Sequence, residues 1–454
     1  MKQFDYHAFF ITDGLSFDQA VQRYANRRTI LLNKCSHITL LSGVVNPLSQ
    51  HNMWFMPDVA IYQDPIMLYL TGLNQLSVGL ILDPFQQKIY LCLPKKDDNK
   101  VFWEGDFLGI SDLNQQEICA LFQVDEVLLY DDLEDSVVSL LRHENDSHLA
   151  LYWHEPKQEE DMLLDSYFLF KRRIETALVD LDIAVVNCFS LLEDRIILDT
   201  IDQANLRHAN KLTADVFKVV CSQISACSFE TEVAGIVKGE IIKRSWMGQS
   251  FPAIVASEKN ATILHYKHHN HKLLKDGLLL LDFGCRYQVM PADISRTIPV
   301  NGRFNPLQRL LYEIVLAAQV YVEQHVKAGI TIDQLNELCW DFIEMELDKQ
   351  FLSQGGSLQR SYVKQPHNVS HLIAHMVHDG DPYRLYRSLP LEVGMVISIE
   401  PGIYGFFVIE IDGKLYEEHI GIRIEDNVLV SNDGCENLSS SCPKSVIDIE
   451  ALCC

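Results

Sequence analysis

Four carboxylates and one histidine in the second half of the chain could together bind divalent metal ions. Asp282, Asp293, Glu400 and Glu425 each lie in or beside an apolar, strand-like run, such as GLLLLDFG or GMVISIEPG. Burying a carboxylate there costs several kcal/mol unless a cation or hydrogen-bond donors offset it. With His371 added, these donors suit a pair of divalent cations better than one. The expected chemistry is attack of metal-activated water on an electrophile.

Strands must position these ligands. The runs GLLLLDFGCRY (277–287) and ADISRTIPV (292–300) predict a hairpin that bends at YQVMP. Asp282 and Asp293 would then point toward one place from adjacent strands. A helix is predicted over 306–326, and the strands MVISIEP and IGIRIEDNVLV then supply the two glutamates in a similar arrangement. Four carboxylates on paired strands would converge on one rigid site.

A chain of 454 residues is expected to form two domains. The first, 1–175, begins with an amphipathic helix over 17–34 that has a basic outer face, followed by alternating short strands, turns and helices. A charged stretch at 154–165 marks the change to the second domain, 176–454. Long helical patterns run from about 162 to 190 and from 202 to 225. The fold class is therefore α/β, with α+β character.

Charge and cysteine usage exclude several classes of function. The net charge of −24 disfavours a nucleic-acid partner, which requires a concentrated basic surface. No window approaches the roughly 18 apolar residues of a membrane span, and the N-terminus is not typical of a signal peptide. The 12 cysteines form no CxxC pair and no disulfide pattern. Free thiols predict a reducing compartment, the cytoplasm.

The ordered ligand set resembles that of the dinuclear metallopeptidases of the pita-bread fold. Within this group the chain resembles aminopeptidase P, the Xaa-Pro aminopeptidase, with prolidase as a close relative. The resemblance rests on IVASEKNATILHY, DFGCRYQVMPADISRTIPVNGRF, HNVSHLIAHMVHD, LEVGMVISIEPGIY and HIGIRIEDNVLV. In the first domain, YQDPIMLYLTGLN (62–74) and FWEGDFLGI (102–110) resemble aminopeptidase P. The resemblance implies a creatinase/aminopeptidase P-like α/β domain followed by a pita-bread catalytic domain.

The resemblance also implies roles for the ligands. Asp282 would chelate one metal, Asp293 and Glu425 would bridge both, and His371 and Glu400 would complete the second site. The family expectation is two Mn²⁺ ions, although the ligands would accept Co²⁺, Fe²⁺ or Zn²⁺. A hydroxide bridging the metals would be the nucleophile. Glu400 would shuttle its proton to the departing proline nitrogen.

Five further positions match supporting residues of the family. His265 would hold the carbonyl or the attacking species, and His378 would stabilise the oxyanion. His367 would line the pocket for the proline ring. Arg387 and Arg423 match arginines near the proline pocket and the bridging carboxylate, where a guanidinium can orient a carboxylate. The implied substrates are peptides with proline at the second position, and a homodimer or homotetramer is expected.

Several alternatives compete with this interpretation. His367, His371, His375 and His378 are spaced as on one helix face, which would allow a helical zinc site, although the glutamate of HExxH is missing. A prolidase would cleave only Xaa-Pro dipeptides. A metal-free binding scaffold of the same fold, or a creatinase-like hydrolase, would be expected to lose ligands that this chain keeps. Ala374 and Met376 also depart from the family pattern and affect the predicted pocket shape.

Overall fold

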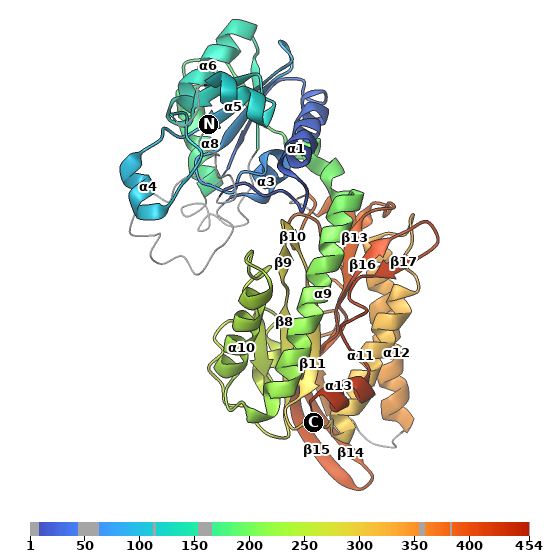
Figure 1. Cartoon of the computed structure of the whole chain (residues 1–454). Coiled ribbons are helices and arrows are strands. Elements are labelled where there is room, and N and C mark those ends of the chain that lie inside the picture. Colours follow the sequence, from blue (N-terminus) through green and yellow to red (C-terminus); the bar gives the residue numbers. More distant parts are fainter. Residues whose placement is uncertain are drawn as a thin grey trace. The chain divides into compact units, whose positions relative to one another are not determined.

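The polypeptide folds into two units, each with its own sheets and core (Figure 1). The computed structural model describes residues 9–43, 63–111, 115–152, 166–353, 359–381 and 384–453. The first unit comprises 1–194 with 381–383, and the second comprises 195–380 with 384–454. The predicted boundary near 175 stays a prediction, and the charged stretch 154–165 lies outside the described residues.

A six-stranded mixed sheet forms the centre of the first unit, in the order β4-β3-β2-β1-β5-β6. β1 pairs antiparallel with β2 and parallel with β5. The strands are short. β1, β2 and β3 are almost wholly buried, as the apolar runs between turn residues predict, whereas the edge strands β4 and β6 are more exposed. Their bounds are β1 Ile38–Ser42, β2 Gly79–Asp83, β3 Lys88–Leu93, β4 Glu126–Leu129, β5 His148–Leu151 and β6 Ala184–Asn187.

Helices cover both faces of this sheet (Figure 1). Alternate strand residues face opposite sides, so one face packs against α1, α3 and α5 and the other against α6 and α8. The bounds are α1 Phe17–Leu32, α3 Pro65–Thr71, α4 Asp98–Glu104, α5 Gln115–Phe122, α6 Leu133–Glu144 and α8 Ser166–Ala177, with the 3-10 turns η2 Tyr130–Asp132 and η3 Phe189–Ile196.

The predicted first helix is confirmed, but the prediction that its basic residues form an outer face is wrong. Ser16 caps α1 in a capping box with Gln19. Arg27 and Arg28 point inward and are buried. The Arg28 guanidinium donates to the carbonyl of Leu70 at 2.7 Å and to other main-chain oxygens nearby. Carbonyl groups at the ends of neighbouring helices therefore bind a cation that the helical pattern alone assigns to solvent.

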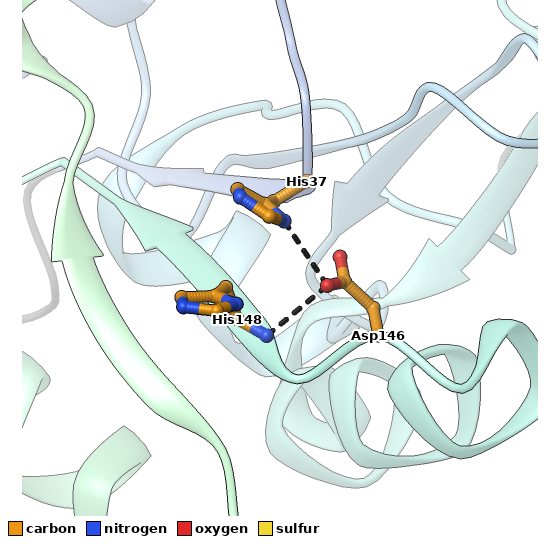
Figure 2. A group of neighbouring side chains, drawn as sticks. All are labelled: His37, Asp146 and His148. Atoms are coloured by element: carbon orange, nitrogen blue, oxygen red, sulfur yellow. Dashed lines mark hydrogen bonds and ion pairs between the residues drawn. The ribbon is translucent and has the colours of Figure 1, made fainter.

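A buried aspartate joins the starts of two parallel strands (Figure 2). Asp146 Oδ2 accepts from the backbone N–H of Ile38, and its Oδ1 accepts from that of His148 at 3.1 Å. The same Oδ1 lies 3.0 Å from His37 Nδ1. These bonds fix β1 beside β5, with the imidazole rings of His37 and His148 4.7 Å apart.

The second unit contains three small antiparallel sheets and a short ribbon. The sheet orders are β11-β8-β7, β12-β14-β15 and β13-β16-β17, and the ribbon is β10-β9. The bounds are β7 Ile254–Ser257, β8 Leu278–Phe283, β9 Arg286–Tyr287, β10 Met290–Pro291, β11 Ile294–Pro299, β12 Gln359–Tyr362, β13 Val396–Ile399, β14 Gly402–Ile411, β15 Lys414–Arg423, β16 Asp426–Val430 and β17 Cys435–Asn437.

Helices pack against these sheets in antiparallel pairs, with α9 beside α10 and α11 beside α12 (Figure 1). One large apolar cluster joins their inner faces to β8, β11, β13 and β16. Among the described residues, no helix has the length and apolarity needed to cross a bilayer. The bounds are α9 Thr200–Gln223, α10 Glu230–Arg244, α11 Pro306–Glu323, α12 Ile332–Ser353 and α13 Val446–Leu452, with η4 Ile224–Ala226, η5 Glu258–Thr262 and η6 Leu385–Ser388.

The predicted hairpin and the helices over 202–225 and 306–326 are confirmed. The helical pattern over 162–190 is wrong in its second half. There α8 ends at Ala177 and β6 follows. Ile183, Val185 and Val186 are β-branched, and pairing of β6 with the edge of β5 outweighs the helical periodicity of the segment.

Candidate metal centre

Two adjacent strands place the aspartates. Asp282 lies near the end of β8, where it is paired with Ser295 of β11, and Asp293 immediately precedes β11. Gly284 allows the chain between them to turn tightly, because a Cβ at this position would lie 1.7 Å from the carbonyl oxygen of Ala292. The predicted convergence of the two aspartates is therefore confirmed.

A second strand pair places the glutamates in a similar way. Glu400 follows β13, Glu425 precedes β16, and the neighbouring residues Ile399 and Asp426 are paired. The predicted single strand around Glu425 is interrupted at Ile424–Glu425, between β15 and β16. This break lets the backbone N–H of Glu425 donate to the carbonyl of Ser295 at 3.0 Å. The two strand pairs are thereby joined at the ligands.

The histidine cluster does not form a helix, so the helical zinc alternative is wrong. Around His371 the chain is extended and runs antiparallel to β13, with Leu372 opposite Ile397. The N–H of Ser398 donates to the carbonyl of His371 at 3.0 Å, and the hydroxyl of Ser398 accepts from the N–H of His371. Of the four histidines, His371 and His378 belong to groups of potential ligand atoms, His378 only in a group with Asp293 and His371. His375 is buried, with Nε2 3.7 Å from Asp202.

The five predicted ligands lie together at one cavity of about 560 Å³. His371 Nε2 lies 3.6 Å from Asp293, 3.5 Å from Glu400 and 4.0 Å from Glu425. Asp282, Asp293 and Glu425 form one group whose ligand atoms lie within 4.8 Å of one another, and His371, Glu400 and Glu425 form another. Because Glu425 belongs to both groups, the geometry suits two ions that share a carboxylate.

Unsatisfied oxygen atoms show that these side chains fit a cation. Asp282 Oδ1 and Glu425 Oε1 are buried and have no hydrogen-bond partner among the described residues. Burial, followed by repulsion from Asp282 and Glu400, raises the pKa of Asp293 well above its usual value. Burial and mutual repulsion likewise raise the pKa of Glu400 and Glu425. Divalent ions would remove this repulsion and use the unpaired oxygens.

The histidine is prepared to act as a ligand. Its Nδ1 lies 3.2 Å from the carbonyl oxygen of Leu372, so Nδ1 carries the proton and Nε2 faces the carboxylates with a free lone pair. Burial lowers the pKa of His371 to about 4, which keeps the imidazole neutral at physiological pH. A neutral imidazole is the form that binds metal.

A buried arginine orients one carboxylate. Arg423 Nη2 donates to Asp282 Oδ2 at 2.6 Å, and its Nε donates to the Ser295 hydroxyl, which donates to Glu425 Oε2 at 2.8 Å. Its Nη1 donates to the hydroxyl of Tyr404. Arg423 lies beside the ligands, as predicted, but it contacts Asp282 directly and reaches Glu425 through Ser295. Sequence reasoning missed Ser295 and Tyr404.

The remaining predicted residues also line the cavity. His265 and His378 are exposed within it, and the His378 ring lies 4.3 Å from that of His371. The proximity of His371, together with burial, lowers the pKa of His378 to about 3. His367 Nε2 lies 3.0 Å from the Tyr404 hydroxyl. Arg387 is half-buried at the same cavity.

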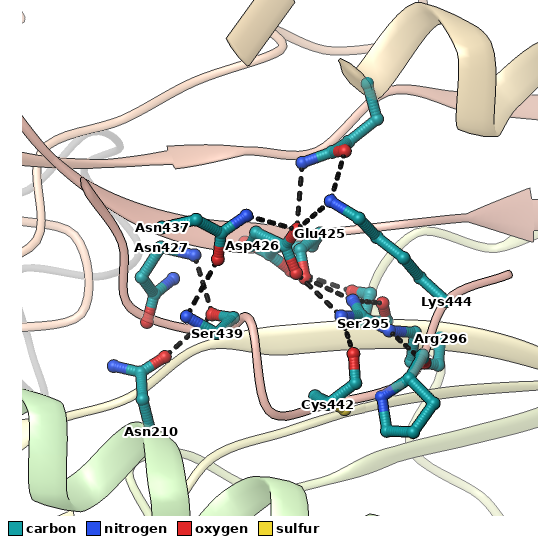
Figure 3. Close-up of polar contacts among 12 residues, drawn as sticks. Asn210, Ser295, Arg296, Glu425, Asp426, Asn427, Asn437, Ser439, Cys442 and Lys444 are labelled. Carbon is teal, nitrogen blue, oxygen red and sulfur yellow. Dashed lines mark hydrogen bonds and ion pairs between the residues drawn. The ribbon is translucent and has the colours of Figure 1, made fainter. Parts of the chain in front are cut away.

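A buried network of charged side chains bonds to the backbone of Glu425 and to the adjacent Asp426 (Figure 3). Arg296 Nη1 donates to the backbone carbonyl of Glu425 at 2.5 Å, and Nη2 donates to Asp426 Oδ1 at 2.6 Å. Lys444, Gln319 and Asn437 donate to the other oxygen of Asp426. Burial alone would raise the pKa of Asp426, but the charges of Arg296 and Lys444 hold it well below its usual range.

An asparagine fixes the backbone of Asp293, as Arg296 fixes that of Glu425. Asn427 Oδ1 accepts from the backbone N–H of Asp293 at 3.0 Å, and its Nδ2 donates to the Asp293 carbonyl at 2.6 Å. The backbone N–H of Asn427 donates to the Ser439 hydroxyl, which donates to Asn210 of α9. The backbones of Asp293 and Glu425 are therefore each fixed by a buried side chain from the strand pair opposite.

A third buried group holds the loop that contains His265. Glu230, at the start of α10, accepts hydrogen bonds from Ser257, Asn260, Tyr266 and the backbone N–H of His271. Burial opposes ionisation, but these bonds lower the pKa of Glu230. Because Tyr266 directly follows His265, the carboxylate fixes the backbone next to that histidine. The sequence contains no pattern that identifies Glu230.

Comparison with known proteins agrees with this geometry. The model of metallopeptidase family M24 matches residues 204–432, and that of the aminopeptidase P N-terminal domain matches residues 24–150. The chain thus belongs to metallopeptidase family M24. Its fold is an aminopeptidase P-type N-terminal domain followed by a pita-bread domain, as predicted. Membership of this family implies divalent metal cofactors.

Individual relatives carry aminopeptidase names. The chain is 28% identical to Xaa-Pro aminopeptidase of Haemophilus influenzae, over 86% of this chain and 88% of the relative. It is 29% identical to Xaa-Pro aminopeptidase 3 of Mus musculus, over 98% and 87%. Among solved structures, proline aminopeptidase P II from Yersinia pestis is similar, with a TM-score of 0.76, 26% identity and coverage of 95% of this chain and 99% of that chain.

Replacing Asp426 by asparagine should destabilise the second unit. Arg296 would then lose its buried counter-charge, and Lys444 would keep, among the described residues, only its pair with Glu323. Leaving a buried charge without its partner costs about 3 kcal/mol or more. The measurement is the free energy of unfolding in denaturant. Glu436→Gln is the matched control, because Glu436 forms a more exposed pair with Arg207, worth about 0.5 kcal/mol. Equal stability of the two variants would contradict the role assigned to Asp426.

Replacing Glu230 by glutamine should lower catalytic efficiency through His265. The glutamine amide would direct a donor at the hydroxyl of Tyr266 or the N–H of His271, so the loop would shift. We expect kcat/KM to fall about tenfold. In a His265→Ala background the same substitution should have little further effect. Fully additive losses in the double variant would exclude an action through His265, and Glu240→Gln at the other end of α10 is the control.

Glu258 should make stability depend on pH. Burial, then repulsion from Glu418, raises its pKa from 4.5 to about 7, and its Oε1 has no hydrogen-bond partner among the described residues. The buried site favours the protonated, neutral form of Glu258. Because the pKa is higher in the folded state, the resulting stability of the fold is fully present below pH 4.5 and is lost as pH rises through about 7. Glu258→Gln should therefore raise Tm relative to wild type at about pH 8 and not at about pH 5.

The matched control for this prediction is Glu410→Gln, since Glu410 is exposed on β14. Thermal denaturation of the three proteins at both pH values gives the comparison. A Glu258→Gln variant whose difference from wild type is the same at both pH values would contradict the raised pKa.

Proposed function

We propose that the chain is a metal-dependent Xaa-Pro aminopeptidase, which releases the N-terminal residue that precedes proline in a peptide. The observation that carries the proposal is the pair of ligand groups sharing Glu425 at a cavity of about 560 Å³. The names of the relatives and of the similar solved structures support the substrate class. We further propose Mn²⁺ as the metal, since carboxylate-rich sites suit it.

The residues that would hold the metals are Asp282, Asp293, His371, Glu400 and Glu425. When bound, divalent cations there would polarise the scissile carbonyl and lower the pKa of a water molecule toward neutrality. The protein's own contribution is to keep the ligands rigid, through the bonds of Arg423 to Asp282 and of Asn427 to Asp293. Rigid ligands require no reorganisation as the reaction proceeds.

Proton transfer is assigned to Glu400. Its carboxylate is at the edge of the ligand group and is less buried than that of Glu425. We propose that it takes a proton from the attacking water and delivers it to the proline nitrogen, which carries no hydrogen in the scissile bond. His378 is neutral because its pKa is low, and it would donate a hydrogen bond to the carbonyl oxygen as negative charge develops there. His265 would hold the carbonyl from the opposite loop.

The proline ring is assigned to the cavity wall around His367. This imidazole packs edge-on against Trp340 and contacts the hydroxyl of Tyr404. Its Nδ1 faces the carbonyl of Asn368 at 2.9 Å, so the Tyr404 hydroxyl donates to Nε2. The Arg387 guanidinium faces the side-chain oxygen of Asn368 at 2.7 Å when that amide is oriented toward it. These contacts hold the planar side chains of His367 and Tyr404 in fixed orientations, which gives an ordered wall against which a ring can pack.

The competing function is that of a prolidase, which the same ligands could perform on dipeptides. A metal-free scaffold is opposed by the retention of all five ligands at one cavity. The homodimer or homotetramer and the cytoplasmic location remain predictions. Free cysteines among the described residues support the reducing compartment, and light scattering of the purified protein would determine the assembly.

Replacing Asp293 by asparagine should remove activity. The neutral amide cannot serve as a shared ligand, so turnover of an alanyl-prolyl-alanine tripeptide should fall at least about a hundredfold. Chelation should abolish activity in wild type and added Mn²⁺ should restore it. Asp433→Asn, an exposed substitution, is the control. Unchanged turnover in Asp293→Asn would contradict the metal site, and faster cleavage of alanyl-proline than of the tripeptide would favour the prolidase.

A further inference from the structure

Cationic side chains are unusually abundant around the cavity. Besides Arg387 and Arg423, three further cations line it, namely Lys267, Arg286 and Arg384. They come from different parts of the chain, and Lys267 and Arg384 are exposed. This concentration of positive charge occurs in a protein whose net charge is −24. Cations gathered at one cavity of an acidic protein indicate an anionic ligand.

These three cations lack the acidic partners that would explain them structurally. Arg423 is bound by Asp282, but no ion pair links Lys267, Arg286 or Arg384 to a carboxylate among the described residues. Arg286 donates to the carbonyl of Val289 at 2.8 Å and is otherwise directed to the cavity. Burial lowers its pKa to about 10, so it still carries its charge at the cost of lost hydration.

The carboxylates at the cavity do not need these cations either. The four acidic residues that line it are the proposed metal ligands, and five cationic residues line it beside them. Two divalent ions would add four positive charges. The metal-loaded cavity is therefore strongly positive, and the cations beyond Arg423 increase an excess that already exists. Such an excess is favourable only when a substrate supplies negative charge.

The position of Arg384 indicates which part of a peptide would supply that charge. Arg384 precedes η6, which contains Arg387. Arg384 and Arg387 line the cavity together with His371 and His378. Arg387 faces Asn368, the neighbour of His367 in the assigned proline pocket. This arginine pair therefore lies on the proline side of the scissile bond.

We propose that the preferred substrates are peptides that carry a carboxylate beyond proline, bound by Arg384 and Lys267 with Arg286 behind them. This inference rests on the proposed function. The N-terminal residue contributes an ammonium group and the arginine pair lies on the proline side, so we assign the negative charge to the leaving portion. Two sources offer the same chemistry: the free C-terminus of a short peptide, or an acidic side chain that follows proline. A guanidinium binds either one with charge-assisted hydrogen bonds.

Matched peptides separate these sources with the metal-loaded enzyme. The first pair is alanyl-prolyl-alanine with a free C-terminus and the same tripeptide as its C-terminal amide. The second set is a tetrapeptide amide with glutamate, glutamine or lysine after proline. In at least one set, we expect kcat/KM to be about tenfold or more higher for the peptide with the additional carboxylate than for its neutral counterpart, chiefly through a lower KM. This is the gain expected from one charge-assisted hydrogen bond. Added salt should reduce this preference.

Substitutions then identify the residues responsible. Arg384→Gln and Lys267→Gln replace exposed side chains, so the fold should be retained and the acid-to-neutral ratio of kcat/KM should fall toward one. Lys275→Gln is the matched control, because Lys275 is exposed and does not line the cavity. It should leave the ratio at its wild-type value.

The outcomes are distinct. A preference only for the free C-terminus supports recognition of short peptides, and a preference only for glutamate supports recognition of an acidic side chain. Equal cleavage of charged and neutral peptides, a preference for lysine, or a ratio unaffected by both substitutions would overturn the inference while leaving the aminopeptidase assignment intact. If no peptide with proline at the second position is cleaved by the metal-loaded enzyme, the proposed function itself fails.

Discussion

The metal centre holds four carboxylates where water is largely excluded, so each charge raises the free energy of the next. Burial and repulsion among the carboxylates raise the pKa of Asp293, Glu400 and Glu425. Within the described part of the chain, only Asp282 has an arginine or lysine, Arg423, bound directly to it. Either protonation or bound cations would relieve this repulsion, and divalent cations do so with the carboxylates ionised. Folding and metal binding are thus coupled through the same side chains.

The remaining architecture keeps these charges from moving apart. The two strand pairs meet where the Glu425 N–H donates to the carbonyl of Ser295, and side chains across that junction fix the backbones of Asp293 and Glu425. Arg296 serves Glu425 and Asn427 serves Asp293. Arg296 and Asp426 are both buried and satisfied by further donors and acceptors, the condition under which buried charge is tolerated. The network thereby supplies rigidity more than net stabilisation.

The sequence predicts where the four carboxylates lie because each is in or beside an apolar, strand-like run, which is a local pattern. It could not identify Glu230, Asn427 or Tyr404, whose partners are distant in the chain and follow no spacing. The spacing of the histidines around His371 favours a helix, yet pairing with β13 makes this segment extended. The buried arginines of α1 could not be predicted from the local sequence either, because the carbonyl groups that bind Arg28 belong to other elements.

Charge is also arranged by distance from the metals. The carboxylates are innermost, where ions would neutralise them, and Lys267 and Arg384 are exposed at the same cavity. A negatively charged protein would repel an acidic peptide at long range, but within a Debye length of about 8 Å the local cations dominate. Selectivity would then arise at the cavity and not during long-range encounter. In this arrangement the charges that hold the metals and those that select the substrate are separate, and either set can change without the other.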